Sequence, residues 1–183
     1  EVDVQMLLED RHIDFIDDQI DLAIRITNEP SLGLKGRKLF DIEHILVATP
    51  EYLEKVSNPK HPRDLKAHQC IYLGEQPSDS KWKFQKGRVT TTVHVKGRYS
   101  ANHTGIRLDA ALQHMGIASL PYFVACNALK TGKLVQVLPE WYFKTYYSGG
   151  AWLLYPATRY LPSKIQVFIQ YLAEKLKHKD FLI

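Results

Sequence analysis

The feature that most constrains the fold is a short apolar run at residues 117–120, enclosed between Gly116 and Pro121. A continuous apolar run bounded by glycine and proline is typical of a fully buried strand. Gly116 suits the left-handed position that ends a preceding helix, and Pro121 is suited to begin a following one. The run therefore predicts a helix, a buried strand and a second helix in succession, as in an α/β fold.

The helix expected before this strand starts near Asn102, whose side chain can accept a bond from a backbone N–H two or three residues on. Ile106, Ala110 and Ala111 mark the face expected to pack against a sheet. The two helices then begin near His103 and near the end of the strand, and helix N-termini attract anions. A ligand-binding cleft at this end of the strand is the resulting hypothesis, with no sign of catalysis.

The first 48 residues predict strands connected by a helix. Alternating apolar residues indicate a strand at 2–8, and Asp10 can cap a short helix with isoleucines at helical spacing up to residue 20. A second strand is expected at 22–26. Because strands joined by a helix usually lie parallel, this order predicts a βαβ unit with a parallel sheet. Residues 38–48 are again strand-like.

The remaining segments have recognisable start and turn signals. Thr49 and Pro50 predict a helix N-terminus, with the helix continuing to Val56. Residues 82–95 predict a half-buried hairpin that turns at Lys86-Gly87. Shorter strands are expected at 71–73, 134–137 and 152–155. A final amphipathic helix opens at Pro162 and places Ile165, Phe168, Ile169, Leu172 and Leu176 on one stripe.

Composition sets further limits on function. The 183 residues, 45% hydrophobic and 24% charged, suffice for one domain or two small lobes of ordinary globular type. The net charge of +4 is mild and the Lys and Arg residues are scattered, so neither a nucleic-acid-binding arm nor a polybasic membrane segment is indicated. No apolar run reaches the ~18 residues of a membrane span, and residues 1–5 lack signal-peptide character. Cys70 and Cys126 are best interpreted as buried thiols in a reducing cytosol.

Catalytic and metal-binding motifs are missing from the sequence. His61, His68 and Cys70 are close together, but their spacing does not place two ligands on one helical face, so structural or surface roles are preferred. Ser119 lies outside the G-x-S-x-G context of a nucleophile, and Cys126 has no identifiable base. Neither phosphate-binding glycine motif occurs. We expect no catalytic residue, no metal and no cofactor.

Polar residues at strand and helix ends are better candidates for ligand binding. Thr27 follows a buried strand, where open α/β sheets place their ligands. Asn102, His103 and Thr104 lie at a helix start, where backbone N–H groups can hold a carboxylate. For Asn102 and Thr104, capping alone explains the residue types equally well and is the simpler interpretation.

Nine short segments form a series along the chain, among them Asp-Leu-Ala-Ile-Arg-Ile at 21–26 and Gly-Ile-Ala-Ser-Leu-Pro at 116–121. The others are residues 46–53, 62–70, 82–84, 101–103, 132–139, 155–156 and 161–164, followed by the closing helix. In this collinear order they resemble the effector-binding domain of LysR-type transcriptional regulators. Each segment is weak alone, but the series covers nearly the whole chain.

The resemblance implies a two-lobed α/β fold like that of type II periplasmic binding proteins, with two crossing hinge strands. The crossings would fall near residues 41–45 and 155–159. The first lobe would hold residues 1–44, the second lobe residues 45–155, and residues 156–183 would return to the first lobe.

The same resemblance implies a small-molecule effector bound in the cleft between the lobes. Carried over by position, the ligand-binding residues would be Ile26 and Thr27 in the first lobe and Asn102, His103, Thr104 and Tyr122 in the second. Helix N-termini favour a carboxylate as the effector chemistry.

Two departures from the family pattern bear on this expectation. Family members carry an N-terminal winged helix-turn-helix and a linker helix, which have no counterpart here, so we expect no DNA-binding residue in this chain. The family domain also opens with a strand and a helix ahead of Glu1. The expected fold therefore lacks its first strand and helix, and its ligand site would be incomplete.

The prediction is therefore the regulatory domain of a bacterial, cytoplasmic LysR-type regulator that contacts DNA only through the helix-turn-helix domain and has no membrane partner. It is expected to form a homodimer through first-lobe elements such as residues 2–20. Two alternatives remain, a transporter-linked solute-binding protein and an enzyme on the same scaffold. A secretion signal in the complete gene would favour the first, and turnover of a bound ligand the second.

Overall fold

The computed structural model describes residues 2–9, 14–27, 33–145, 149–158 and 160–177. The chain divides into two compact units, the first comprising residues 1–41 and 149–183 and the second residues 42–148. The expected lobe boundaries after residues 44 and 155 differ from this division. The larger difference arises because residues 149–155 pair with strands of the first unit.

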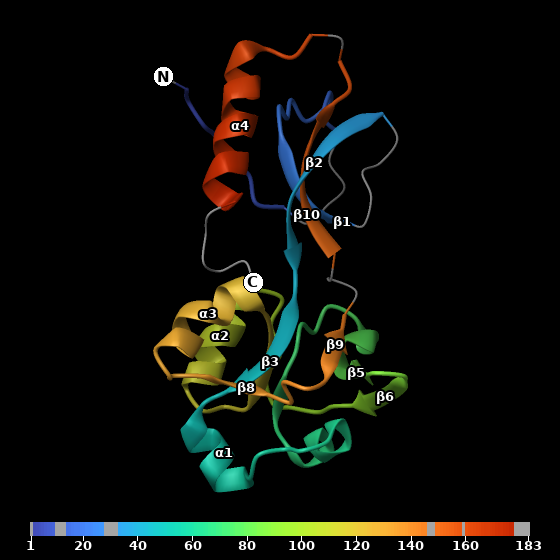
Figure 1. Cartoon of the computed structure of the whole chain (residues 1–183), viewed down its shortest axis with the longest axis vertical. Helices are drawn as coiled ribbons and strands as arrows, with labels where there is room; N and C mark the ends of the chain where they lie inside the picture. The colour runs from blue at the N-terminus through green and yellow to red at the C-terminus, as the bar shows by residue number, and fades with distance from the viewer. Residues whose placement is uncertain (1, 10–13, 28–32, 146–148, 159, 178–183) are drawn as a thin grey trace. The chain divides into compact units, whose positions relative to one another are not determined.

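The first unit is built on a three-stranded sheet in the order β1-β10-β2 (Figure 1). Its strands are β1 (Ala23–Thr27), β2 (Leu34–Ile42) and β10 (Gly149–Pro156). Strand β1 runs antiparallel to β10. Helix α4 (Ser163–Lys177) packs Ile165 and Ile169 against Leu153 of β10, so the amphipathic stripe predicted for this helix is confirmed.

The predicted parallel βαβ unit at the N-terminus is wrong. Residues 2–9 form no strand, and the side chains of this segment are exposed. Residues 10–13 of the expected helix lie outside the described residues, while 14–20 form turns and no helix. Alternation of apolar residues predicts a strand only where a neighbouring strand and a covering layer stabilise it.

The second unit contains a four-stranded sheet in the order β4-β7-β3-β8. Its strands are β3 (His44–Ala48), β4 (Cys70–Ile71), β7 (Ile117–Pro121) and β8 (Val135–Val137). Every residue of β7 is buried, as the apolar run predicted. Strand β7 is antiparallel to β3 and parallel to β4, and β8 is antiparallel to β3.

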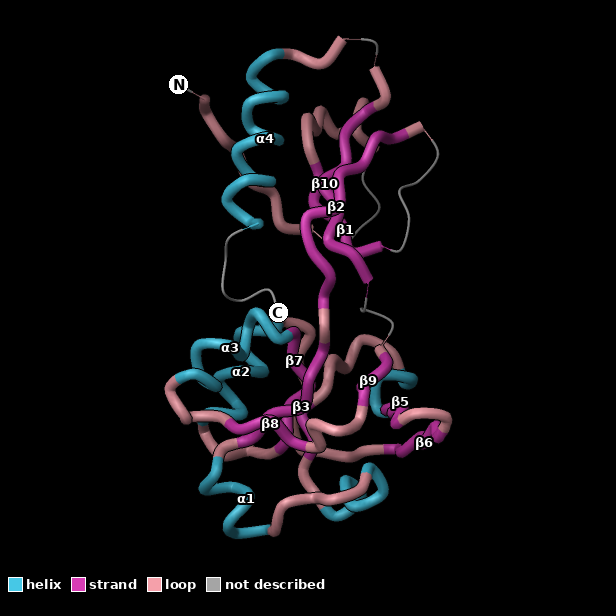
Figure 2. Tube along the Cα trace, viewed as in Figure 1, coloured by secondary structure: helices cyan, strands magenta, loops and turns pink. Residues whose placement is uncertain are grey.

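Two layers cover this central sheet (Figures 1 and 2). Helices α2 (Thr104–Leu112) and α3 (Tyr122–Lys130) pack on one face, where their alanines meet Ile45 and Val47 of β3. The other face is covered by the sheet β6-β5-β9, whose aromatic residues Trp82, Phe84 and Phe143 fill a second core. These strands are β5 (Lys81–Lys86), β6 (Val89–His94) and β9 (Tyr142–Lys144), so the hairpin prediction is confirmed.

Helix α1 (Pro50–Val56) follows β3 and begins as predicted, because the Thr49 hydroxyl accepts a hydrogen bond from the N–H of Tyr52 at 3.3 Å. Two short 3-10 helices, η1 (Pro62–Ala67) and η2 (Pro77–Ser80), connect this region to the hairpin.

Gly116 is required for a different reason from the one expected. The left-handed residue that follows α2 is His114, with φ of 58°. A Cβ at Gly116 would come within 2.3 Å of the carbonyl oxygen of Gln69. That oxygen also accepts a hydrogen bond from the N–H of Ile117 at 2.9 Å. Gly116 therefore lets β7 approach the chain beside β4.

Candidate functional site

The N-cap of α2 is His103, and the prediction of Asn102 is wrong by one residue. The Nδ1 atom of His103 accepts a hydrogen bond from the N–H of Ile106 at 3.4 Å, while Asn102 is exposed before the helix. A Cβ at Gly105 would lie 3.0 Å from Cε1 of the imidazole. Because Gly105 has no side chain, the His103 ring can fold over the first turn of the helix.

The buried face of α2 carries a charged residue. Arg107 is only 3% exposed and shares this face with Ala110 and Ala111, whereas Ile106 is 45% exposed. The predicted use of Ile106 as a buried position is therefore wrong. Arg107 donates from Nη1 to the carbonyl oxygen of Ser119 at 3.0 Å and lies 3.5 Å from its hydroxyl. This contact attaches the first turns of α2 to β7.

Helix α3 starts at the end of the same strand. Pro121 is the last residue of β7 and the N-cap of α3, and the N–H of Tyr122 donates to the carbonyl oxygen of Glu43 at 2.8 Å. Because Arg107 reaches Ser119 two residues before this point, the N-terminal turns of both helices lie at one end of β7. Two helix N-termini and a guanidinium together make this end electropositive.

His44, at the start of β3, adds no positive charge to this region near neutral pH. It is 8% exposed and lies opposite Pro121 in the sheet. Burial, and then the positive charge of Arg107, lower the pKa of His44 to about 4. The imidazole is therefore neutral at physiological pH.

The six residues predicted to bind ligand fall into two groups. His103 and Thr104 lie at the start of α2 and Tyr122 at the start of α3, with Asn102 just ahead of α2. Ile26 and Thr27 form the end of β1 in the first unit. Sequence reasoning missed Arg107, His44 and Ser119. The available signal was the spacing of Arg107, Ala110 and Ala111, which puts a charge on an otherwise small, apolar stripe.

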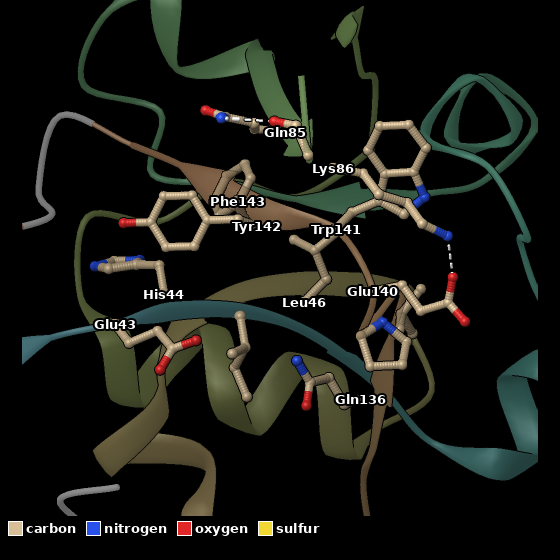
Figure 3. Close-up of a pocket in the computed structure, with 14 residues that line it drawn as sticks. Glu43, His44, Leu46, Gln85, Lys86, Gln136, Glu140, Trp141, Tyr142 and Phe143 are labelled. Carbon is tan, nitrogen blue, oxygen red and sulfur yellow. Dashed lines mark hydrogen bonds and ion pairs between the residues drawn. The ribbon is translucent and has the colours of Figure 1, made fainter. Parts of the chain in front are cut away.

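A hollow of about 330 Å³ lies on the hairpin side of β3, and Glu43 and His44 line it (Figure 3). Its lining comes from residues 43–46, 85–87, 136–137 and 139–143. His44 and Tyr142 flank one end, and the ion pair between Lys86 and Glu140 lies near Trp141 at the other. This volume is at the lower end of the range for small-molecule sites. The sequence did not indicate it.

Both cysteines are free thiols. Neither Cys70 nor Cys126 forms a disulfide, and burial raises the pKa of the Cys70 thiol to about 12. Cys126 is only half-buried, unlike the prediction. Within the described ranges, no three His, Cys, Asp or Glu side chains come together as a metal site, and no helix is long and apolar enough to span a bilayer.

The fold is that of an α/β domain of two units. Residues 1–177 match the family model described as the LysR substrate binding domain, and the chain belongs to this family. It is 53% identical over 174 residues to the probable HTH-type transcriptional regulator LtrA of Klebsiella pneumoniae, covering 95% of this chain and 56% of that protein. It is 35% identical over 182 residues to the HTH-type transcriptional regulator PtxR of Pseudomonas aeruginosa, and the match covers 98% of this chain and 57% of PtxR.

Solved structures agree with this assignment. The full-length structure of AphB, a virulence activator of Vibrio cholerae, matches with a TM-score of 0.78 and 26% identity, over 93% of this chain and 57% of that one. The regulatory domain of CrgA from Neisseria meningitidis matches with a TM-score of 0.75 and 26% identity, over 90% and 81%. The predicted family and its two-lobed, periplasmic-binding-protein-like fold are confirmed.

The chain spans little more than half the length of the curated relatives that it matches. LysR-type regulatory domains bind small-molecule effectors and form oligomers, and an N-terminal domain of these regulators binds DNA. The family consists of transcriptional regulators and not of enzymes.

Proposed function

We propose that this chain is the effector-sensing domain of a bacterial, cytoplasmic LysR-type transcriptional regulator, and that it acts by binding and not by catalysis. The observation that carries the proposal is the match to the LysR substrate binding domain over residues 1–177. The 53% identity to a probable HTH-type transcriptional regulator supports it further.

The effector is a small anion, and a carboxylate is the chemistry that best fits the second unit. Thr104 offers a hydroxyl at the start of α2, and both helices supply positive dipole ends. Their donors are the first-turn N–H groups other than those of Ile106 and Tyr122, which already donate to His103 and Glu43. Buried Arg107 adds a full positive charge close to both. Asn102, His103 and Tyr122 are the other proposed contacts from this unit, and Ile26 and Thr27 those from the first.

Binding regulates by shifting a conformational balance. An effector that prefers one arrangement of the units, or of the subunits, moves the population toward that arrangement by its difference in affinity. The shift then changes how the DNA-binding domains of the complete regulator meet their operator.

The proposed oligomer is a homodimer that uses the exposed apolar residues of segment 2–20. Met6 is 76% exposed, Leu8 88% and Ile16 83%, which is unfavourable for a monomer in water. A second copy that covers these side chains would remove this cost.

The proposal is tested by screening the chain against small mono- and dicarboxylates for thermal stabilisation, followed by calorimetric titration of those that stabilise it. We expect at least one carboxylate to bind saturably and to be recovered chemically unchanged, as NMR of the ligand would show. The same compound should alter operator binding by the complete regulator. Conversion of the ligand would instead support the enzyme alternative, and binding without any effect on operator occupancy would support the solute-binding alternative.

A further inference from the structure

The Lys and Arg residues are spread along the chain, but one segment contains no acidic residue to balance them. Residues 81–98 contain six Lys and Arg residues and no Asp or Glu. The rest of the chain contains 18 Lys and Arg residues and 20 Asp and Glu residues. This segment is the β5–β6 hairpin and its continuation. Lys81, Lys83, Lys86 and Arg88 belong to the hairpin, which is shown with its edge strand β9 in Figure 1, and Lys96 and Arg98 follow it.

The two faces of the sheet β6-β5-β9 differ sharply. Trp82, Phe84 and Phe143 point inward and are buried. The alternate residues of β5 and β9 point the other way: Lys81, Lys83, Tyr142 and Lys144 are exposed, and Gln85 is half-buried. We call these residues, together with Thr90, Thr92 and His94 of β6, the outer face.

The lysines of the outer face have no carboxylate to neutralise them in the described part of the chain. Lys83 lies directly opposite Lys144 in the ladder, and like charges in this relationship are destabilising. The nearby carboxylate of Glu140 is taken by Lys86. An anionic partner would relieve this repulsion.

Hydroxyl groups interleave with these cations. Lys83 is paired with Thr92, and Gln85 is paired with Thr90 on one side and Tyr142 on the other. Lysine ammonium groups with threonine and tyrosine hydroxyls are the side chains that contact DNA phosphates. Alternate residues of a strand are about 6.7 Å apart, so Lys81 and Lys83 present separate charges along the strand direction.

We propose that the outer face docks on the phosphate backbone of duplex DNA, without reading its sequence. Protein interfaces are depleted in lysine and enriched in apolar and aromatic anchors, whereas the only aromatic residue of this face is Tyr142. A partner protein therefore fits this face less well than a regular array of phosphates. The contact would add non-specific affinity to that of the DNA-binding domain of the regulator.

The test compares two charge-matched double variants by fluorescence anisotropy with a labelled duplex of arbitrary sequence, over a series of salt concentrations. Lys83→Gln with Lys144→Gln removes two outer-face charges. Lys35→Gln with Lys164→Gln removes two exposed charges of the first unit and is the control. We expect the outer-face variant to bind several-fold more weakly at low salt, with a slope of log K against log salt reduced by about 2.

The control variant should lose little affinity and should keep the wild-type slope. Melting curves of the free proteins exclude unfolding as the cause, because removing a like-charge pair should not lower the melting temperature. Equal DNA binding by the two variants overturns the proposal. It is also overturned if the outer-face variant differs from the control only in self-association by sedimentation, or only in retention on anionic phospholipid vesicles.

Discussion

The guanidinium of Arg107 donates a hydrogen bond to the carbonyl oxygen of Ser119 at 3.0 Å, and both residues are buried. This contact fixes the start of α2 at the end of β7 where α3 also begins. The two helix N-termini and the arginine charge thereby act on the same region. The proposed anion-binding site of this unit relies on that attachment.

Replacing Arg107 with lysine should destabilise the second unit. Lysine carries the charge but lacks the planar fork, so a buried charge would lose part of its hydrogen bonding. We expect the free energy of unfolding to fall by about 1–3 kcal/mol in urea denaturation. The exposed Arg63→Lys substitution should change it by less than about 0.5 kcal/mol. Equal stability of the two variants would contradict a structural role for the Arg107 contact.

The pH dependence of stability should report on His44. Its folded-state pKa, about 4, is below the unfolded value of 6.5, so the unfolded chain binds the extra proton first as pH falls. The contribution of neutral His44 to the free energy of unfolding is fully present above pH 6.5. It is lost as the pH falls from about 6.5 to 4, and the loss is of order 3 kcal/mol.

The His44→Gln variant should therefore lose less stability than the wild type over this pH range in urea denaturation. Burial also lowers the pKa of His68, which stays in both proteins and cancels in the comparison. Parallel stability curves for the two proteins would show that His44 does not titrate in this way.

The corrected cap of α2 yields a second stability comparison. His103→Ala removes the acceptor for the N–H of Ile106 and should cost about 0.5–1 kcal/mol. Asn102→Ala removes an exposed side chain ahead of the cap and should be nearly neutral. Thermal denaturation of both variants checks the assignment, and a larger loss for Asn102→Ala would restore Asn102 as the cap.

Much of the second unit could be predicted because its helix cap, hairpin turn and buried strand are each encoded by residues adjacent in sequence. The cap at Thr49, the hairpin turn at Gly87 and the buried run at 117–120 each fix the backbone through residues adjacent in sequence. The family could also be predicted, because its short motifs occur in order along the chain.

The failures share a dependence on distant parts of the chain. Residues 2–8 alternate like a strand, but in the structure no described strand pairs with them. Asn102 is of a type preferred at N-caps, but the acceptor in the structure is the imidazole of His103, which residue preferences do not indicate. Arg107 can be buried because it donates a hydrogen bond to Ser119 on β7, a contact that helical spacing does not reveal. Spacing alone therefore assigned the buried position to Ile106.

Self-association should depend on the exposed apolar residues near the N-terminus. The chain should sediment as a dimer at tens of micromolar, an order of magnitude expected for weak dimers. Ile16→Glu should shift it toward monomer, because this side chain is 83% exposed and a charge there would oppose burial. The comparably exposed Tyr160→Glu, outside the segment, is the control. A strictly monomeric wild type would rule out the proposed dimer.

The most direct test of the account is calorimetric titration of Thr104→Ala with the carboxylate found in the ligand screen. We predict binding about 2- to 12-fold weaker than that of the wild type, equivalent to one hydrogen bond of about 0.5–1.5 kcal/mol, at an unchanged melting temperature. Thr92→Ala, which removes an equally small hydroxyl from the hairpin, should bind as the wild type does. If Thr104→Ala also keeps wild-type affinity, the start of α2 is a structural cap and the effector binds elsewhere.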